Sequence, residues 1–333
     1  MTIYLRISSL VFMAIGLAAC QAADTPPRDA FDQLLAAKLP EANYETLQKV
    51  RKVLRETVAN QIFIEGGTFT MGDWGAVGDD GVWRPYFPPT AEKNKAHQVT
   101  LSSYNLGKYE VTGEEYDTFL LATGRPVIIR ANIIGGEMGG TPIVIEEQKR
   151  TPYEQNPEAF DYIKKPAMDR WQDAKDYCLW LGEISGLSFD LPTNAQFEYA
   201  ARNRGEKWLF ATYDGNPVNY GHPYIDRLKI FSTPVGTQLP QNPLGLYDMG
   251  ENAPEWVNDW YSPSYYSENP EITDPQGPTS GTERTVRSLG VSSLAFSFSR
   301  SKAPEIRKDG YLVTNGFRCA VNSPAPVTLK IPE

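Results

Sequence analysis

Three acidic side chains lie close together in the segment "YDMGENAPEW", namely Asp248, Glu251 and Glu255. Hard cations such as calcium take about six to eight oxygen ligands from carboxylates, backbone carbonyls and water. A turn that holds several carboxylates, a glycine and the helix-breaking Pro254 can direct both side chains and carbonyls inward. The segment therefore predicts a calcium site, although a solvated acidic turn anchored by Trp256 would carry the same residues.

Other catalytic chemistries find little support in the residue inventory. The two histidines, His97 and His222, are far apart and form no HxxxH pair, so one chain cannot assemble a three-histidine iron centre. His97 lies in the strand-like "HQVTL", which favours structural packing. No G-x-S-x-G elbow and no P-loop occur. The neighbouring Glu114 and Glu115 are better explained as a charge cluster at a helix start than as an acid–base pair.

The first residues predict where the protein is exported rather than a part of its fold. Residues 1–20 carry Arg6 and then a short apolar run, Leu10–Ala19, which falls short of the ~20 residues that span a bilayer. The "LAAC" that ends at Cys20 matches a bacterial lipobox, whose cysteine is lipidated after cleavage; the alternative is an ordinary secretory signal. Because Gln21 follows the cysteine, we expect a lipid anchor in the outer membrane of a Gram-negative cell, facing the periplasm.

Two cysteines remain after Cys20, namely Cys178 and Cys319. Cysteines of exported chains are often paired, because the compartment is oxidising. At this point a disulfide and two buried free thiols both remain open.

Composition narrows the partners and the architecture. The formal net charge is −9 and the basic residues form no patch, so nucleic acid is not expected as a partner. The acidity favours a protein partner with a basic face. Aromatic residues make up 12% of the chain beside 27 glycines and 26 prolines, which indicates an irregular, loop-rich α+β globule.

Periodicity divides the chain into a short N-terminal segment and one main domain. Residues 21–60 read as a tether and a helical segment, which Pro40 should divide into two helices. The main domain is expected over 61–325, followed by a C-terminal tail, 326–333. Within the domain, Thr112 and Glu115 form a capping-box pattern at a helix start. A second amphipathic helix is expected to end at Gly186.

Several motifs recur together in one order: "FIEGGTFTMG", "LPTNAQFEYAAR", "NPLGLYDMGENAPEWVNDWY" and "TNGFRCA". In this combination the chain resembles the formylglycine-generating enzyme (sulfatase-modifying factor) family from about Phe63 to Val321. The resemblance implies a single, irregular α+β domain related to C-type lectins, preceded here by the N-terminal helices.

The resemblance also implies particular site residues. The matching family segment binds a structural calcium, which places side-chain ligands at Asp248 and Glu255 and carbonyl ligands at Glu251 and Ala253. This chain departs from the family at Glu251 and Pro254, where Gly and Trp are usual. A second calcium site, which would use Asn219 and Asp226, is not expected.

Comparison with the family's cysteines implies that this chain keeps one disulfide bond and lacks the cysteine pair of the oxidase. The "DYCLW" and "GFRCA" cysteines match a disulfide of the family, which implies a Cys178–Cys319 bond. Active members are copper-dependent oxidases with two cysteines just before "GFRC", whereas the matching stretch from Arg287 to Arg300 has none. Serine cannot supply the soft thiolates that monovalent copper requires. We therefore expect neither copper nor iron, and no formylglycine-generating activity.

Three roles fit a scaffold without its oxidase cysteines. The first is a non-catalytic recognition protein, most concretely an immunity protein that neutralises an exported antibacterial toxin such as a type VI secretion effector. Its partner surface would be 124–165 together with 261–285, because exposed loops on a rigid base suit binding. The alternatives are a periplasmic enzyme or maturation factor of the siderophore-processing type, and a structural component of an envelope machine.

Overall fold

The computed structural model describes residues 29–129, 148–149, 163–217, 233–269, 271–288, 296–304 and 314–330. Cys20, His222, Asn219 and Asp226 lie outside these ranges, as does most of 124–165. Among the helices that the described ranges contain, none has the length and apolar character to cross a membrane.

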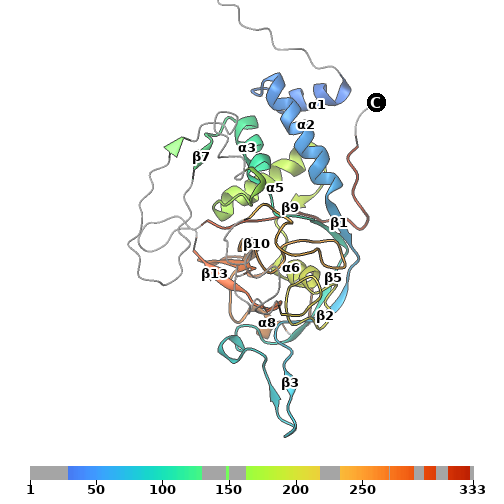
Figure 1. Ribbon diagram of the computed structural model, residues 1–333, viewed down its shortest axis with the longest axis vertical. Coiled ribbons are helices and arrows are strands. Elements are labelled where there is room, and N and C mark those ends of the chain that lie inside the picture. Colours follow the sequence, from blue (N-terminus) through green and yellow to red (C-terminus); the bar gives the residue numbers. More distant parts are fainter. Residues whose placement is uncertain are drawn as a thin grey trace, which may run out of the picture.

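Two N-terminal helices pack directly on the rest of the domain (Figure 1). α1 (Ala30–Lys38) and α2 (Tyr44–Ala59) begin at capping side chains, Asp29 and Asn43, and are separated at Pro40, which confirms the expected break. Their apolar faces join the same buried cluster as the later helices. These helices are therefore part of the hydrophobic core, held there by burial of apolar surface.

Two further helices complete this end of the molecule. α3 (Gly113–Ala122) starts at the expected capping box, in which the Thr112 side chain accepts from the Glu115 amide and Glu115 bonds back to Thr112. α5 (Trp171–Ser185) ends where Gly186 takes a left-handed conformation with φ 75°, as its sequence predicts.

Small sheets form the other half of the scaffold. The four-stranded sheet has the order β1 (Gln61–Ile64), β6 (Tyr104–Gly107), β14 (Ala320–Val321) and β9 (Phe189–Asp190), with antiparallel neighbours. In the second sheet, β5 (His97–Leu101) lies between antiparallel β2 (Gly67–Met71) and parallel β11 (Glu271–Thr273). The third has the order β10 (Glu255–Trp260), β12 (Arg284–Arg287) and β13 (Ser301–Ala303).

One short helix connects these sheets. α6 (Asn194–Ala201) begins at a Thr193 capping box and contacts β2, β5, β10 and β12. All of its residues are buried. α6 therefore has no solvent-facing side and is enclosed by these strands. Its contacts position the strands that carry the candidate site. The result confirms the expected irregular α+β domain preceded by helices.

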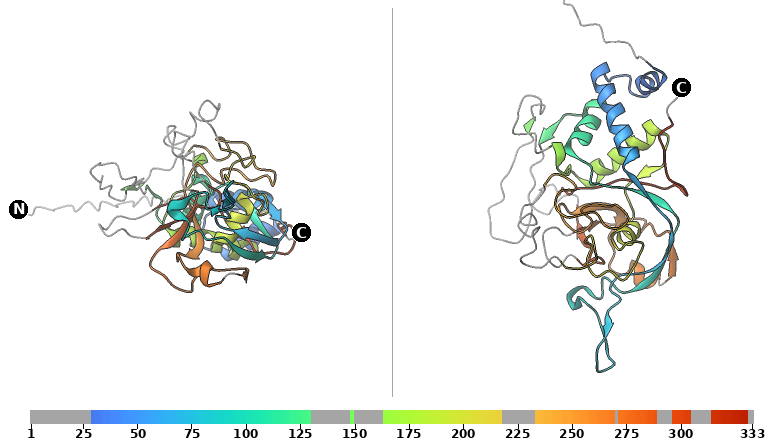
Figure 2. Two further views of the ribbon diagram at one scale, coloured as in Figure 1. Left: turned by 90° about the horizontal axis from the view of Figure 1, so that it is seen from below. Right: turned by 45° about the vertical axis from the view of Figure 1, so that its right-hand side comes forward.

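The remaining elements lie toward the surface. A hairpin of β3 (Ala76–Val77) and β4 (Trp83–Arg84) projects from the end of the molecule opposite to α1 and α2, as both side views show (Figures 1 and 2). The short elements η1 (Pro88–Thr90), β7 (Ile128–Ile129), β8 (Gln148–Lys149) and α8 (Tyr265–Glu268) complete the described set. In the C-terminal segment, Val327 and Leu329 pack against the core rather than extending into solvent.

Candidate functional site

The acidic segment forms a tight turn that leads into β10. Asp248 and Asn252 take left-handed conformations with φ 58° and 67°, a region in which Asp and Asn are the most tolerated residues after Gly. The turn is folded inward, so that Asp248, Glu251 and Glu255 are all buried. It is therefore not the solvated surface turn that its composition would also have allowed.

Glu255, the first residue of β10, is paired with Arg318. The guanidinium donates from Nε to Oε2 at 2.8 Å and from Nη2 to Oε1 at 2.7 Å. Both side chains are fully buried. The remaining Arg318 donors reach backbone carbonyls, including that of Gly107. This two-point geometry is the strong form of an arginine–carboxylate contact.

A fourth carboxylate, Glu110, approaches the turn from the segment between β6 and α3. Its Oε2 accepts from Asn252 Nδ2 at 2.6 Å and its Oε1 from the Ala253 amide at 3.1 Å. Glu110 was not predicted from the sequence, since its partners are 142 and 143 residues away and no local pattern marks it. Asn252 also accepts from the Thr233 amide at 2.9 Å, so it ties three segments together.

Burial shifts the protonation of this cluster. Removal from water, followed by repulsion from Asp248, raises the pKa of Glu110 and of Glu251 well above the usual range. Burial likewise raises the pKa of Glu255, against the attraction of Arg318, and raises that of Asp248 to about 6. Four carboxyl groups thus face the one guanidinium of Arg318. They can all ionise together only if further positive charge is present; otherwise at least one of them stays protonated.

The donor set fits a calcium ion in part. Asp248 Oδ2 accepts from the Gly236 amide at 2.6 Å, while its buried Oδ1 has no partner among the described residues. The Glu251 carbonyl accepts from Ser288 Oγ at 3.1 Å. Within the described ranges, no three His, Cys, Asp or Glu side chains are arranged to hold a metal ion. The predicted calcium ligands, two side chains and two backbone carbonyls, therefore stay a prediction. Of the two side chains, Asp248 is the one whose second oxygen accepts no hydrogen bond from a described residue.

The stretch from Arg287 to Arg300, which the resemblance is expected to align with the oxidase centre, is described only in part, since 289–295 lie outside the described residues. Its later half contributes to an aromatic cluster. Phe296 stacks on Phe298 at 5.2 Å between ring centroids and on Phe210 at the same distance. Ser297 Oγ donates to the Trp208 carbonyl at 2.5 Å, so this hydroxyl serves the packing of the chain.

A buried ion network adjoins that cluster, since Arg287 donates to the Ser297 carbonyl. Glu198, on α6, pairs with Arg202 at 2.9 Å and with Arg287 at 3.2 Å. Burial lowers the pKa of both arginines, and the shared carboxylate opposes that shift. With all three side chains buried, the network fixes β12 against α6.

Two other sequence predictions can be located. His97 stacks on Tyr266 at 4.4 Å, its Nδ1 lies 2.8 Å from the Lys95 carbonyl, and burial lowers its pKa, which agrees with a packing role. Cys178 of α5 and Cys319 beside β14 form the expected disulfide, with Cα atoms 5.7 Å apart.

This combination of irregular sheets, a buried acidic turn before β10 and a disulfide to the "GFRC" cysteine defines a domain of the formylglycine-generating-enzyme type. The chain belongs to the sulfatase-modifying factor family, because the family model described as "Sulfatase-modifying factor enzyme 1-like domain" matches residues 46–323.

Known relatives share this domain in different settings. A formylglycine-generating enzyme of Streptomyces coelicolor is 27% identical over 303 residues, which cover 78% of this chain and 88% of the enzyme. The serine/threonine-protein kinase pkn1 of Chlamydia pneumoniae is 26% identical over 305 residues, 88% of this chain but only 43% of the kinase. The structure of PvdO from Pseudomonas aeruginosa matches with a TM-score of 0.52 and 23% identity, over 78% of this chain and 93% of PvdO. That structural likeness shows the fold alone.

Proposed function

We propose that this protein is a non-catalytic recognition protein, held by a lipid on Cys20 in the outer membrane and facing the periplasm. In its most concrete form it is an immunity protein that neutralises an exported antibacterial toxin of the type VI secretion effector type. Two features argue against oxidase chemistry. The stretch from Arg287 to Arg300 has no cysteine. Cys178 and Cys319 are bonded to each other, so neither offers a thiolate to copper.

The observation that carries the proposal is the projecting β3–β4 hairpin. It lies outside both segments that were expected to contact a partner, 124–165 and 261–285. It exposes Val77, Val82 and Trp83, at 65%, 52% and 52% of their full accessible surface. Trp83 is held in place, because its Nε1 donates to the Trp74 carbonyl at 2.9 Å. A rigid, exposed tryptophan loses little conformational entropy on binding, which makes it a suitable anchor for a protein interface.

Charge on the hairpin indicates what kind of surface it would meet. Asp79 and Asp80 are exposed in the turn between the two strands, and Asp80 pairs with Arg84 across the hairpin. An apolar pocket with a basic rim complements this tip, in keeping with the acidity of the whole chain. The partner is therefore proposed to receive Trp83 in a pocket bordered by Lys or Arg.

The test uses a soluble form with Cys20→Ser and a native extract, from which an exported partner is recovered and then purified. Trp83→Ala is expected to weaken binding by at least tenfold, since it removes the anchor. Leu179→Ala, which truncates an exposed leucine on α5, is the matched control and should bind normally. Equal binding by the Trp83→Ala form would refute the hairpin as the contact surface.

Two other roles have their own discriminating results. A maturation factor of the siderophore-processing type would turn over a substrate, and a stably bound redox metal in the purified protein would favour it. A component of an envelope machine would co-purify with several envelope proteins. We favour recognition because the hairpin is a specific surface feature, whereas neither alternative has a comparable observation.

We also propose that the acidic turn binds a structural calcium ion through Asp248, with Glu255 and the carbonyls of Glu251 and Ala253. Calcium at one hundred times its dissociation constant would stabilise the fold by about 3 kcal/mol. Melting should therefore occur at a higher temperature in calcium than in EDTA. Asp248→Asn should remove most of that difference, and Asp79→Asn on the hairpin should keep it. Identical melting of the unaltered protein in calcium and in EDTA would contradict the site.

A further inference from the structure

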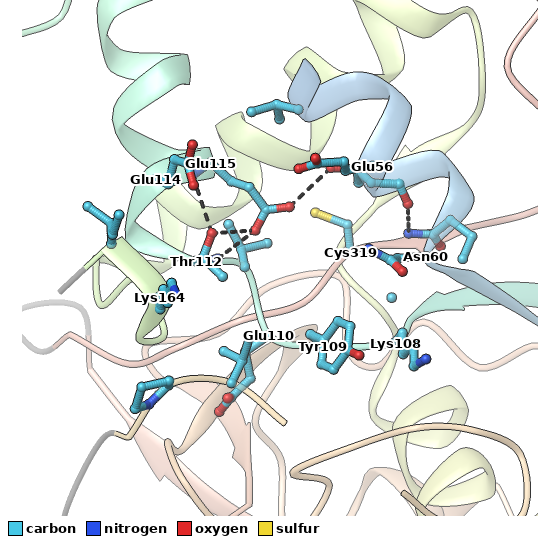
Figure 3. Close-up of a pocket in the computed structure, with 18 of the residues that line it drawn as sticks. Glu56, Asn60, Lys108, Tyr109, Glu110, Thr112, Glu114, Glu115, Lys164 and Cys319 are labelled. Atoms are coloured by element: carbon cyan, nitrogen blue, oxygen red, sulfur yellow. Dashed lines mark hydrogen bonds between the residues drawn. The ribbon is translucent and has the colours of Figure 1, made fainter. Parts of the chain in front are cut away.

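A cavity of about 310 Å³ lies where the helices α2 and α3 meet the segment that follows β6. Its walls come from the C-terminal part of α2, the segment from β6 into α3, and the residues around 163–164 and 234–237 (Figure 3). This volume is at the lower end of the range for small-molecule sites, which suits a ligand of a few non-hydrogen atoms.

The cavity has an apolar lining with acidic groups. Apolar contact comes from five side chains: Val53, Val111, Ile163, Pro234 and Val235. Four glutamates also line it, against two lysines: Glu56, Glu110, Glu114, Glu115, Lys108 and Lys164. Glu110 is already bonded to Asn252 and Glu114 is paired with Lys52, so the acids that remain for a ligand are Glu56 and Glu115. A short aliphatic cation matches such a carboxylate and the apolar wall together.

Glu115 is the carboxylate best placed to hold such a cation. It reaches from α3 toward α2 in Figure 3, where the Thr112 amide and Thr112 Oγ1 each donate to Oε2 at 2.7 Å and Thr57 Oγ1 donates to Oε1 at 3.2 Å. A carboxylate has about four acceptor positions, so these bonds fix its orientation without using all of its capacity. The group is thus held ready before a ligand arrives, which reduces the cost of binding.

Two lysines near the cavity direct their charge at other partners. Lys108 Nζ lies over the rings of Tyr109 and Tyr247, 5.3 and 5.6 Å from their centroids, so its charge faces aromatic rings. Lys52, from outside the lining, pairs with Glu114 at 2.7 Å. These contacts engage the ammonium groups of Lys108 and Lys52 with groups other than Glu115.

We propose that this cavity is a binding site for a primary aliphatic ammonium group, which donates to Glu115 while its alkyl chain lies against Val111 and Val235. The site is independent of the hairpin and of its protein partner, because no residue of β3 or β4 lines the cavity. A free alkylamine and a lysine side chain share this chemistry.

The test is a ligand-observed NMR titration of the protein with three four-carbon probes at pH 7.5: n-butylamine, 1-butanol and butyrate. Butylamine should bind saturably, butanol at least tenfold more weakly, and butyrate not at all. N-acetyl-lysine amide, tested in parallel, distinguishes a free amine from a peptide side chain: binding as strong as that of butylamine indicates the side chain, and weaker binding indicates the free amine. The absence of saturable butylamine binding, or equal binding of butyrate, would overturn the proposal.

Variants locate the binding. Val235→Phe fills the cavity and should abolish butylamine binding, whereas Val77→Phe on the distant hairpin should leave it unchanged. Glu115→Gln keeps an acceptor oxygen for the capping box and should weaken binding of butylamine at least tenfold, with little change for butanol. Butylamine binding that survives Val235→Phe in a folded protein would show that the amine sits elsewhere and would sink the assignment.

Discussion

Individual buried acids in this domain are held by donors but lack full charge compensation, and Asp259 is a clear case outside the acidic turn. It is 2% exposed, and its Oδ2 accepts from the Asn194 amide at 2.7 Å. Burial raises its pKa from 3.8 to about 6. The folded state therefore binds this proton more tightly than the unfolded state does.

This shift predicts a pH dependence with a definite sign. Because the folded pKa is raised, the contribution of Asp259 to stability is fully present below pH 3.8 and is lost as the pH rises through about 6. The difference corresponds to about 3 kcal/mol. Asp259→Asn removes the titration, so the variant should gain about 2 kcal/mol relative to the original protein between pH 4 and pH 7, since part of the loss has already occurred at pH 4. Urea unfolding at both pH values measures this gain.

The control is an exposed acid, and Asp79→Asn should show no such change between the two pH values. A stability difference between the Asp259→Asn variant and the original protein that stays constant with pH would mean that Asp259 is ionised in both states.

At the same scale, the sequence predicted part of the candidate site and could not predict the rest. Asp248, Glu251 and Glu255 are neighbours in the chain, so their proximity is visible without a structure. Glu110 and Arg318 join them across 142 and 63 residues, through bonds to Asn252 and Glu255. Such contacts depend on the tertiary fold and leave no local pattern.

Among the elements, α2 gives the most direct test of how the N-terminal helices contribute. Leu54 is fully buried in the cluster that also contains residues of α3 and α5. Leu54→Ala should cost about 2–5 kcal/mol of unfolding free energy, since it removes buried apolar surface and leaves a cavity. The exposed neighbour provides the control, and Arg55→Ala should change stability by less than about 0.5 kcal/mol.

Denaturant unfolding distinguishes a core helix from a separate spacer. If α2 were a spacer, Leu54→Ala would leave the unfolding of the domain unchanged, and that result would contradict the packing of α2 in the core.

Elements with strong local signals were the predictable ones. α3 starts at a capping box on Thr112, and α5 ends at the left-handed Gly186. Each of these signals is encoded within a few residues. The hairpin with Trp83 was not predicted, because its strands are only two residues long each. Short strands such as β9 and β14 owe their conformation to distant partners rather than to their own sequence.

For the whole molecule, the Cys178–Cys319 bond links two halves that are separated by 141 residues. Closing a loop of this length lowers the entropy of the unfolded chain, which stabilises the fold by about 5 kcal/mol in the chain-entropy model. The double variant Cys178→Ala/Cys319→Ala should therefore unfold at a markedly lower urea concentration. Protein treated with dithiothreitol during unfolding should match the variant, and equal midpoints with and without the bond would contradict this.

The position of β14 has a consequence for how the protein is made. Its two residues, Ala320 and Val321, occupy an inner place in the four-stranded sheet, between β6 and β9. A ribosome that has finished β6 and β9 must still add a long stretch of chain before β14 exists. The four-stranded sheet therefore cannot close until the segment that carries β14 has left the ribosome, and until then this part of the chain stays incompletely folded.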